Sequence, residues 1–351
     1  SHWDVYPAGA SSFAAQPTSY ALPAARCNTQ FDAFLGYQSL HYALFDIDAD
    51  HRSDLIVYHD DCDASVGVDH WDIYHGGATG FAAQPTPYSL PAARCNTSFD
   101  SLGSAASPLT YGLVDLTGDG RADLVVTHDQ CDASVGSDHW DVYPAGDSGF
   151  AAQPIAFALP AARCNQPFDS VSGVTSSLTY ALVDLDQDAR PDLVVTHDDC
   201  DPAVGSTHWD FYRAGSSGFM AQPTAYSVPA ARCNRAFDSL ASSSSVHYQW
   251  TKLQCGVNAM IVTSDDCDSA VGTDHWDLYT GDAHGLQAAP TPIALPAPRC
   301  NQSFDAAAEN VSSLSYLMTD LLPGSTPDLV VTSDQCASDV GASHWDVYPL
   351  K

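Results

Sequence analysis

The sequence predicts an all-β fold, namely a five-bladed β-propeller built from four-stranded antiparallel blades. Two observations point to this fold class. A unit of about 69 residues recurs along the chain, and every apolar run within the unit is short and bounded by Gly, Pro, Asp or Ser. Repetition at a fixed period is typical of propellers and solenoids, and short bounded apolar runs are typical of strands.

The tripeptide His-Trp-Asp marks each copy of the repeat. It begins at residues 2, 70, 139, 208, 275 and 344, with spacings of 68, 69, 69, 67 and 69 residues. Six occurrences bound five full repeats and a partial sixth copy at 344–351. A lone four-stranded sheet cannot bury both of its faces, whereas sheets stacked around an axis can. We therefore expect residues 1–351 to form one propeller domain.

Four strands are expected in each repeat. In one copy they are an inner strand at 178–184, a second strand at 192–196, a third strand at 208–212 and an outer strand at 222–229. These runs are rich in Val, Leu, Tyr and Trp and show no sustained helical period, so long amphipathic helices are not expected. Four strands per repeat are what one propeller blade requires.

The two ends of the chain predict how the ring closes. The last inner and second strands, near 316–331, are followed by a third strand but by no outer strand. Segment 16–23 has the pattern of an outer strand, so we expect N-terminal strands to join the last blade and close the ring. One His-Trp-Asp strand, at 2–6 or 344–348, then has no place in this count.

The charge of the chain excludes some partners. It carries 43 acidic against 12 basic residues, a formal net charge of −31 at pH 7. Nucleic acids and anionic membrane surfaces both require a basic face, so neither is expected as a partner. No apolar run approaches the roughly 20 residues of a membrane-spanning helix, so no membrane insertion is expected. Nearly all of the acid is aspartate, a turn former and a ligand of hard cations.

Three turns between an inner and a second strand carry acidic or hydroxyl residues at alternate positions. Oxygen atoms at positions 1, 3, 5 and 9 of such a loop can surround one Ca²⁺ ion, whereas the bare carboxylates would repel one another. The pattern predicts about three structural calcium sites, with a solvated Asp-rich hairpin as the alternative. The expected ligands are Asp46, Asp48, Asp50 and Asp54; Asp115, Thr117, Asp119 and Asp123; and Asp184, Asp186, Asp188 and Asp192.

The pattern Asp-x-Asp-x-Asp-Gly-x-x-Asp-Leu ahead of an apolar run resembles the FG-GAP or VCBS-type repeat, which also builds the propeller of integrin α chains. The Gly-x-x-Gly-Phe turns at 77–81, 146–150 and 215–219 resemble it as well. The resemblance implies that calcium is structural and locks the hairpin of each blade. The fourth repeat has no acid in this loop and the fifth keeps only Asp320 and Asp328, so no calcium is expected in either.

Ten of the eleven cysteines recur, one in an Arg-Cys-Asn segment and one in an Asp-rich loop of each repeat. Both segments are expected at the same end of a blade, and ordered disulfides imply an oxidising compartment. Pairing within a repeat is favoured, and pairing between successive repeats, which would lock the ring covalently, stays open. The favoured pairs are Cys27–Cys62, Cys95–Cys131, Cys164–Cys200, Cys233–Cys267 and Cys300–Cys336, with Cys255 free and buried.

The end of the ring opposite the calcium loops gathers aromatic, acidic and amide residues. Such a combination suits carbohydrate recognition, because a ring covers the C–H faces of a sugar and the polar groups bind its hydroxyls. Fivefold repetition would add avidity. The alternatives are that Trp209 packs between blades and that the arginine pairs with a neighbouring aspartate. The ligand-binding candidates are Arg163, Asn165, Asp169, Asp199, Asp201, His208 and Asp210.

The sequence contains no nucleophile elbow, zinc-protease motif or phosphate-binding Gly-Lys loop, so we expect no catalytic residue and no enzymatic activity. Trp250, Lys252 and Cys255, which are unique to the fourth repeat, indicate its degeneration. The sequence favours a secreted or cell-surface protein, stabilised by calcium, that binds an extracellular glycan or protein in a lectin-like or adhesive role. The alternative is a structural protein that self-associates through an unpaired edge strand.

Overall fold

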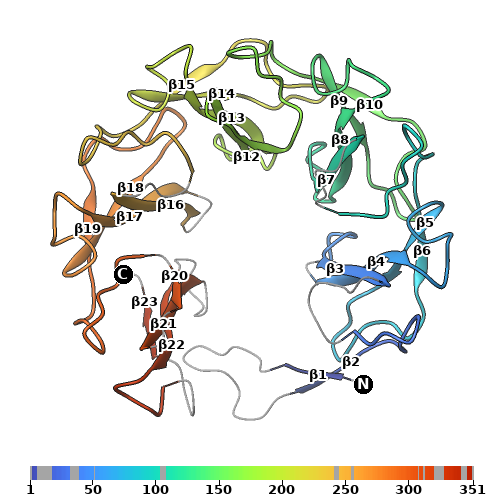
Figure 1. The fold of residues 1–351 in the computed structure, drawn as a ribbon, viewed down its shortest axis with the longest axis horizontal. Coiled ribbons are helices and arrows are strands. Elements are labelled where there is room, and N and C mark those ends of the chain that lie inside the picture. Colours follow the sequence, from blue (N-terminus) through green and yellow to red (C-terminus); the bar gives the residue numbers. More distant parts are fainter. Residues whose placement is uncertain are drawn as a thin grey trace.

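The computed structural model describes residues 2–5, 18–31, 39–50, 52–102, 108–240, 245–253, 257–306, 308–310, 313–319, 328–340 and 346–349. These residues form strands and turns, and none of them is helical. Five antiparallel sheets are arranged around a ring, so the predicted five-bladed β-propeller is confirmed (Figure 1). Within these ranges there is no helix that could cross a membrane.

The first strand of a typical blade lies next to the centre of the ring, and the following strands lie further out in chain order (Figure 1). Blade I consists of β3 (Leu40–Phe45), β4 (Asp54–Asp60), β5 (His70–Tyr74) and β6 (Thr86–Ser89). Blade II consists of β7 (Leu109–Val114), β8 (Asp123–Asp129), β9 (His139–Tyr143) and β10 (Ile155–Ala158). Blade IV consists of β16 (Val246–Lys252), β17 (Asn258–Asp265), β18 (His275–Thr280) and β19 (Thr291–Ala294).

Blades III and V carry a short additional strand on the inner side, which the sequence pattern did not predict. Blade III consists of β11 (Ser172–Val174), β12 (Leu178–Val183), β13 (Asp192–Asp198), β14 (His208–Tyr212) and β15 (Thr224–Ser227). Blade V consists of β20 (Ala308–Asn310), β21 (Leu314–Thr319), β22 (Asp328–Asp334) and β23 (Asp346–Pro349). Among the described residues, blade V therefore has four strands but no outer strand, because β20 supplements its inner side.

The prediction that N-terminal strands join the last blade is wrong for the described residues. β1 (His2–Val5) and β2 (Thr18–Ala21) form a two-stranded sheet of their own, with His2 opposite Ala21. The same hairpin recurs as β5–β6, where His70 lies opposite Ser89. Because β1 precedes β2 closely in the chain, their pairing closes a much shorter loop than pairing with β23 would. Both strands lie next to blade I (Figure 1).

Apolar clusters between adjacent blades form the core. The third-strand tryptophans Trp71, Trp140, Trp209 and Trp276 are at most 1% exposed. The indole of Trp140 donates a hydrogen bond of 2.6 Å to the carbonyl of Phe168, in the connection to blade III. The other three indoles bond in the same way to Phe99, Phe237 and Phe304. Packing of Trp209 between blades, the alternative to a ligand-facing role, is thus what the structure shows.

In blades I to IV, a glycine turn connects the blade to the outer strand before it. Between blades I and II, the Ser89 amide donates to the Ser148 carbonyl at 3.0 Å and the Phe150 amide to the Ser89 carbonyl at 2.9 Å. Gly149 has a φ of 152°. A Cβ at this position would lie 2.6 Å from the Cβ of Ser89, so the close approach requires glycine. The equivalent pairs are Ala21 with Gly80, Ala158 with Gly218 and Ser227 with Gly285.

Candidate binding face and calcium loops

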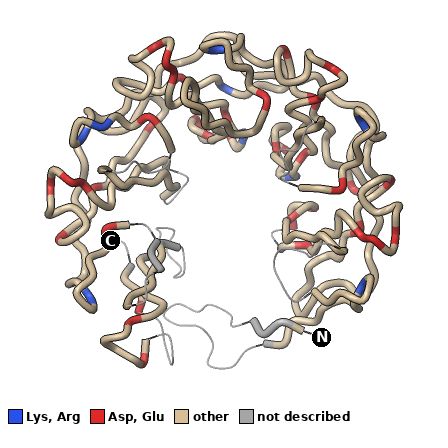
Figure 2. The backbone as a smooth tube through the Cα atoms, viewed as in Figure 1, with Lys and Arg blue, Asp and Glu red and all other residues tan. Residues whose placement is uncertain are grey.

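Because neighbouring strands run in opposite directions, the loops fall into two groups. The three Asp-rich loops at 46–54, 115–123 and 184–192 lie at one end of the ring together with the glycine turns; this is the Asp-loop end. The Arg-Cys-Asn segments and the Cys-containing loops lie at the other, the disulfide end. Acidic residues are distributed over all blades, and basic residues are few (Figure 2). The residues expected to bind calcium and those expected to bind a ligand thus lie at opposite ends of the ring.

The three Asp-rich loops share one wound backbone conformation. In the loop of blade III, the Asp188 amide donates to carboxylate oxygens of Asp184 and Asp186 at 3.1 and 3.2 Å. Gln187 and Ala189 have φ values of 65° and 72°, in the left-handed region. The loop of blade I places Ala49 there, and that of blade II uses Gly118 and Gly120. Non-glycine residues in this region are strained, so the sequence holds the conformation against a local cost.

The last acid of each loop is buried and ties the hairpin to the third strand. Asp192 accepts hydrogen bonds from the amides of Leu185 at 3.0 Å and Ala214 at 2.9 Å. Burial raises the pKa of Asp192 to about 6, and the nearby carboxylate of Asp186 adds to the increase. Asp54 and Asp123 are buried in the same way, and desolvation also raises their pKa values. A divalent cation would relieve this repulsion.

Other side chains at the loops already contribute positive charge or hydrogen bonds. The Arg213 Nε lies 2.5 Å from Asp186, and the His75 Nδ1 lies 3.1 Å from Asp48. In the loop of blade II, the Thr117 amide donates to Asp123 at 2.9 Å, so Thr117 is fixed by the last acid. Side-chain oxygens occur at alternate positions of each loop, all from carboxylates except the Thr117 hydroxyl, and this set of hard oxygen donors fits Ca²⁺.

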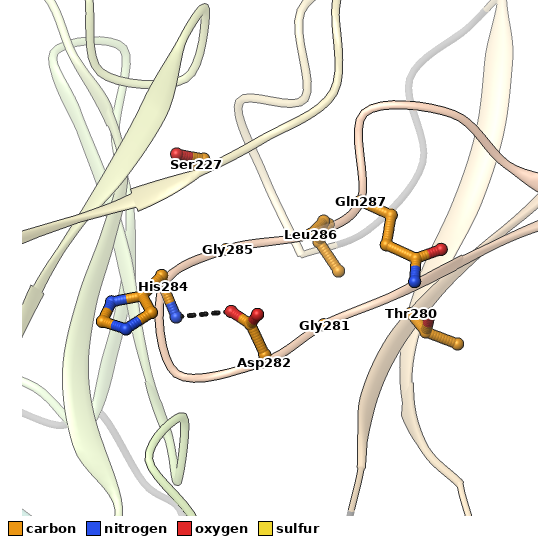
Figure 3. A pocket seen from close by; sticks show the side chains of 8 residues that line it. All are labelled: Ser227, Thr280, Gly281, Asp282, His284, Gly285, Leu286 and Gln287. Carbon is orange, nitrogen blue, oxygen red and sulfur yellow. Dashed lines mark hydrogen bonds between the residues drawn. The ribbon is translucent and has the colours of Figure 1, made fainter.

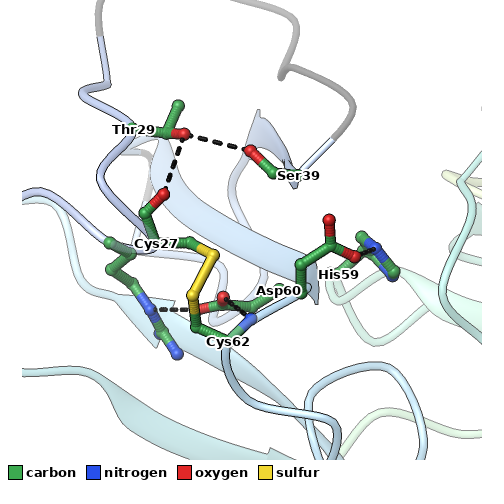
Figure 4. The surroundings of a disulfide bond; sticks show 8 residues. Cys27, Thr29, Ser39, His59, Asp60 and Cys62 are labelled. Atoms are coloured by element: carbon green, nitrogen blue, oxygen red, sulfur yellow. Dashed lines mark hydrogen bonds and ion pairs between the residues drawn. A yellow bond between two sulfur atoms is a disulfide. The ribbon is translucent and has the colours of Figure 1, made fainter.

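The disulfide end contains the five bonds that pair cysteines within a repeat, so the favoured connectivity is confirmed. Figure 4 shows the bond between Cys27 and Cys62, beside Asp60. In every repeat the first cysteine and the asparagine after it have positive φ values, for example 47° at Cys164 and 59° at Asn165. The asparagine side chain is exposed in all five copies. Cys255 lies outside the described residues.

An arginine in each repeat is enclosed by two aspartates and a tyrosine. The Arg163 Nε donates to Asp198 at 2.7 Å, and its Nη1 bonds to Asp210 and, at 3.2 Å, to the Tyr212 hydroxyl. Burial alone would lower the pKa of Arg163, but its bonds to Asp210 and Tyr212 raise it above the usual value. Two of the ligand-binding candidates, Arg163 and Asp210, therefore bond to each other below the surface. Arg26, Arg94, Arg232 and Arg299 repeat the arrangement.

The other ligand-binding candidates lie at the same end and are at least partly exposed to solvent. Asn165, Asp169 and Asp199 are exposed. Asp201 is half-buried and accepts from the Ala203 amide at 3.2 Å. His208 is half-buried, and its Nε2 lies 3.3 Å from Asp210. The aromatic rings in this region, those of Phe168 and Trp209, are buried, so the exposed face of blade III offers polar groups to a ligand.

One pocket was not predicted from the sequence. It lies at the Asp-loop end, where blade III meets the glycine turn of blade IV, and has a volume of about 280 Å³ (Figure 3). Its wall includes Asp282 and His284, at positions where blade III has Gly215 and Ser217. These two substitutions within the repeat were the signal that could have revealed it. The lining residues are Ser227, Thr280, Gly281, Asp282, His284, Gly285, Leu286 and Gln287.

No protein-family model and no curated protein matches this chain. Among solved structures, it is similar to a lectin from Agrocybe aegerita described as recognising non-reducing terminal N-acetylglucosamine, with 14% identity, a TM-score of 0.45 and coverage of 90% of this chain and 65% of the lectin. It is also similar to an exo-β-1,3-galactanase from Phanerochaete chrysosporium, with 11% identity, a TM-score of 0.29 and coverage of 91% and 70%. Thus the chain spans just under two thirds of the lectin, and neither similarity assigns it a function.

Proposed function

We propose that this chain is an extracellular, calcium-stabilised propeller that binds carbohydrate through its disulfide end. One observation carries the proposal. In all five repeats two consecutive non-glycine residues, the Cys and Asn of Arg-Cys-Asn, are held at φ values of 47° to 60° and present an exposed asparagine. Asparagine tolerates this region, but a residue such as cysteine pays roughly 1–2 kcal/mol there, and such strain is concentrated at functional sites.

The chemistry next to these asparagines suits neutral hydroxyl-rich ligands. A carboxamide can donate to one hydroxyl and accept from another. The residue after the buried aspartate of each Cys loop is also exposed and is Asp or Gln: Asp61, Gln130, Asp199, Asp266 and Gln335. The net charge of −31 disfavours anionic glycans. Five similar sites on one rigid ring would bind a glycan-coated surface with avidity.

Extracellular localisation and structural calcium belong to the same proposal. Five disulfides within one chain fit an oxidising compartment. The Asp-rich loops of blades I, II and III would each hold one Ca²⁺ ion through their alternating side-chain oxygens. When bound, the ion would cross-link the two strands of a hairpin and neutralise the carboxylates.

The test is binding of the purified protein to an array of immobilised neutral and acidic glycans. We expect neutral glycans to be bound, and we expect replacement of all five asparagines by glycine to remove that binding. Glycine accepts the left-handed backbone, so the turns should keep their shape. The matched control is Ser216→Ala, an exposed change at the Asp-loop end. The variant set is Asn28→Gly, Asn96→Gly, Asn165→Gly, Asn234→Gly and Asn301→Gly.

An assembly function is the competing proposal, and one observation favours it. Among the described residues, β23 pairs only with β22, which leaves its outer edge without a strand partner. Unpaired edges can recruit a strand from another chain. If the protein binds no glycan on the array but grows into larger assemblies with concentration in light scattering, the carbohydrate proposal fails and assembly is favoured.

A further inference from the structure

Several residues that break the repeat pattern lie together at the junction between blades III and IV. Blade IV has Trp250 on its inner strand where blades I, II and III have leucine. At the start of its second strand it has Asn258, where those blades have Ser53, Ala122 and Pro191. Its glycine turn contains Asp282 and His284. Degeneration would scatter such changes, whereas these four face one junction or its pocket.

Three buried polar atoms at this junction have no hydrogen-bond partner. They are the Tyr226 hydroxyl, the Trp250 Nε1 and the Asn258 Oδ1. In the described part of the chain only one other buried side-chain atom, the His75 Nδ1, is in the same state, and it lies 3.1 Å from a carboxylate oxygen of Asp48. A buried polar atom without a partner costs about 1–3 kcal/mol. Three of them at one junction indicate that a ligand or an ordered water belongs there.

The three atoms come from facing surfaces. Trp250 and Asn258 project from the same face of β16–β17, since Trp250 pairs with Met260 and Asn258 with Lys252. That face is turned toward blade III, because the Asn258 Nδ2 donates to the Leu185 carbonyl at 2.9 Å. The ring of Trp250 lies 6.2 Å from that of Tyr226, on the outer strand of blade III. The unpartnered groups thus face one another across the junction.

Tyr226 also connects this group to the pocket. At the junction of blades I and II, the equivalent Tyr88 hydroxyl donates to the Gly146 carbonyl at 2.9 Å. The Tyr226 hydroxyl instead occupies the space that a Cβ of residue 281 would fill, and it has no acceptor there. Blades II and III have Ala145 and Ala214 at this position, and blade I has Gly76, but there the Tyr20 hydroxyl donates to the Gly77 carbonyl at 3.1 Å. Because Gly281 has no Cβ and lines the pocket, the Tyr226 hydroxyl reaches the pocket wall at this position.

The pocket wall is polar on the side of the turn. Figure 3 shows Asp282, with its carboxylate accepting from the His284 amide at 2.7 Å, and Gln287 on the other arm of the turn. Thr280 and Ser227 add hydroxyl groups. The wall thus offers both hydrogen-bond donors and acceptors and carries no arginine or lysine.

We propose that the junction between blades III and IV is a binding site for one neutral, hydroxyl-rich molecule of about monosaccharide size. The pocket holds the molecule against the turn that carries Asp282 and His284, and its hydroxyls, directly or through an ordered water, partner the three atoms behind Gly281. Hydroxyls both donate and accept, which suits an indole donor, an amide acceptor and a phenol together. The ligand class rests on the proposed carbohydrate function, but the place does not, because it is argued from the pocket and the three buried atoms of this one junction.

The test is a titration of protein labelled with ¹⁵N at the tryptophan indoles, using glucose, galactose, mannose and N-acetylglucosamine as separate probes. We expect one of them to shift the Trp250 signal saturably at one equivalent per chain; Trp250→Phe assigns that signal. The indoles already bonded to phenylalanine carbonyls serve as internal controls and should not move: Trp71, Trp140, Trp209 and Trp276.

Variants separate this site from the disulfide end. Asp282→Gly and His284→Ser give the turn of blade IV the residues found in blade III. Each should weaken the affinity for the sugar at least about tenfold, because each removes a polar contact. Ser217→Ala, at the equivalent of His284, should change nothing. Absence of a Trp250 shift with all four sugars, or a shift unaffected by both variants, overturns the inference. The five-asparagine variant should keep the Trp250 titration, so its loss of array binding would bear only on the proposed function.

Discussion

Single residues at the disulfide end divide into those that hold a blade together and those that face solvent. Arg163 is of the first kind: its side chain is 13% exposed, and that of its partner Asp198 is 3% exposed. Removing one partner of a buried pair leaves the other charge without compensation, which is more costly than loss of the pair as a whole. The arginine therefore holds the Cys-Asn turn in place, and its side chain is already engaged by Asp198 and Asp210.

Replacing Arg163 by methionine tests this role. Asp198 and Asp210 would be left buried without the guanidinium, so we expect the free energy of unfolding to fall by roughly 3–5 kcal/mol. Thermal or urea unfolding at neutral pH measures the change. Arg235→Ala is the control, because the Arg235 side chain is exposed and donates to the Ser245 hydroxyl at 3.2 Å. Equal stability of the methionine variant and the unmodified protein would mean that Arg163 is available to bind ligand after all.

Gly149, in a glycine turn at the Asp-loop end, has a different role: it allows the outer strand of the neighbouring blade to approach closely. Substitution by alanine would place a Cβ 2.6 Å from Ser89 and keep a φ of 152° that alanine disfavours. We expect a loss of about 2 kcal/mol or more in unfolding free energy. Gly112→Ala is the matched control, since its Cβ would meet nothing closer than 3.7 Å and strand alanines occur at the equivalent Ala43 and Ala181. An unchanged free energy of unfolding in Gly149→Ala would contradict the close packing at this junction.

At the scale of elements, the hairpin of an inner and a second strand is the unit that calcium would stabilise. The loop of β12 and β13 is closed from within by amide bonds to Asp184, Asp186 and Asp192. Those bonds hold its shape but leave the carboxylates near one another. Calcium would therefore add stability to a loop that is already formed, rather than create the loop.

A melt of the non-reduced protein with and without a calcium chelator tests that role. Each site saturated at one hundred times its Kd adds about 2.7 kcal/mol, so chelation should lower Tm clearly. Asp188→Ala should remove part of the shift by disabling one loop. Asp138→Ala is the control, because Asp138 is an exposed acid that lies outside the three loops. Identical Tm values with and without chelator would indicate that the loops are solvated hairpins that bind no calcium.

Elements that repeat could be predicted from the sequence, and those that do not repeat could not. Strand order follows from the fivefold spacing and is confirmed. The spacing only favoured the cysteine pairing within repeats over pairing between them, and the favoured set is the one that the structure shows. β11 and β20 have three residues each, too few for a recognisable pattern. The partner of β2 was ambiguous because residues 1–7 and 343–349 are identical, so only chain proximity distinguishes β1 from β23. At the candidate site, the pocket was missed because Trp250 and its neighbours resembled decay of the repeat.

For the whole molecule, stability should be graded around the ring, because each blade contacts only its neighbours. Blades II and III share apolar clusters with a blade on either side. The β1–β2 hairpin has four residues per strand and is joined to blade I through Ala21 and the packing of Tyr20 and Leu22. A two-stranded sheet of this size is marginal by itself.

Hydrogen exchange measures this gradient directly. We expect the amides of β8 and β13 to exchange most slowly, since nearly every residue of these strands is buried and they lie in the middle of their blades. The amides of β1 and β2 should exchange fastest among the strands, because opening that hairpin exposes little apolar surface. Exchange in β1 and β2 as slow as in β13 would contradict the separate hairpin. It would show instead that the N-terminal strands are held from both sides, as in a ring closed against blade V.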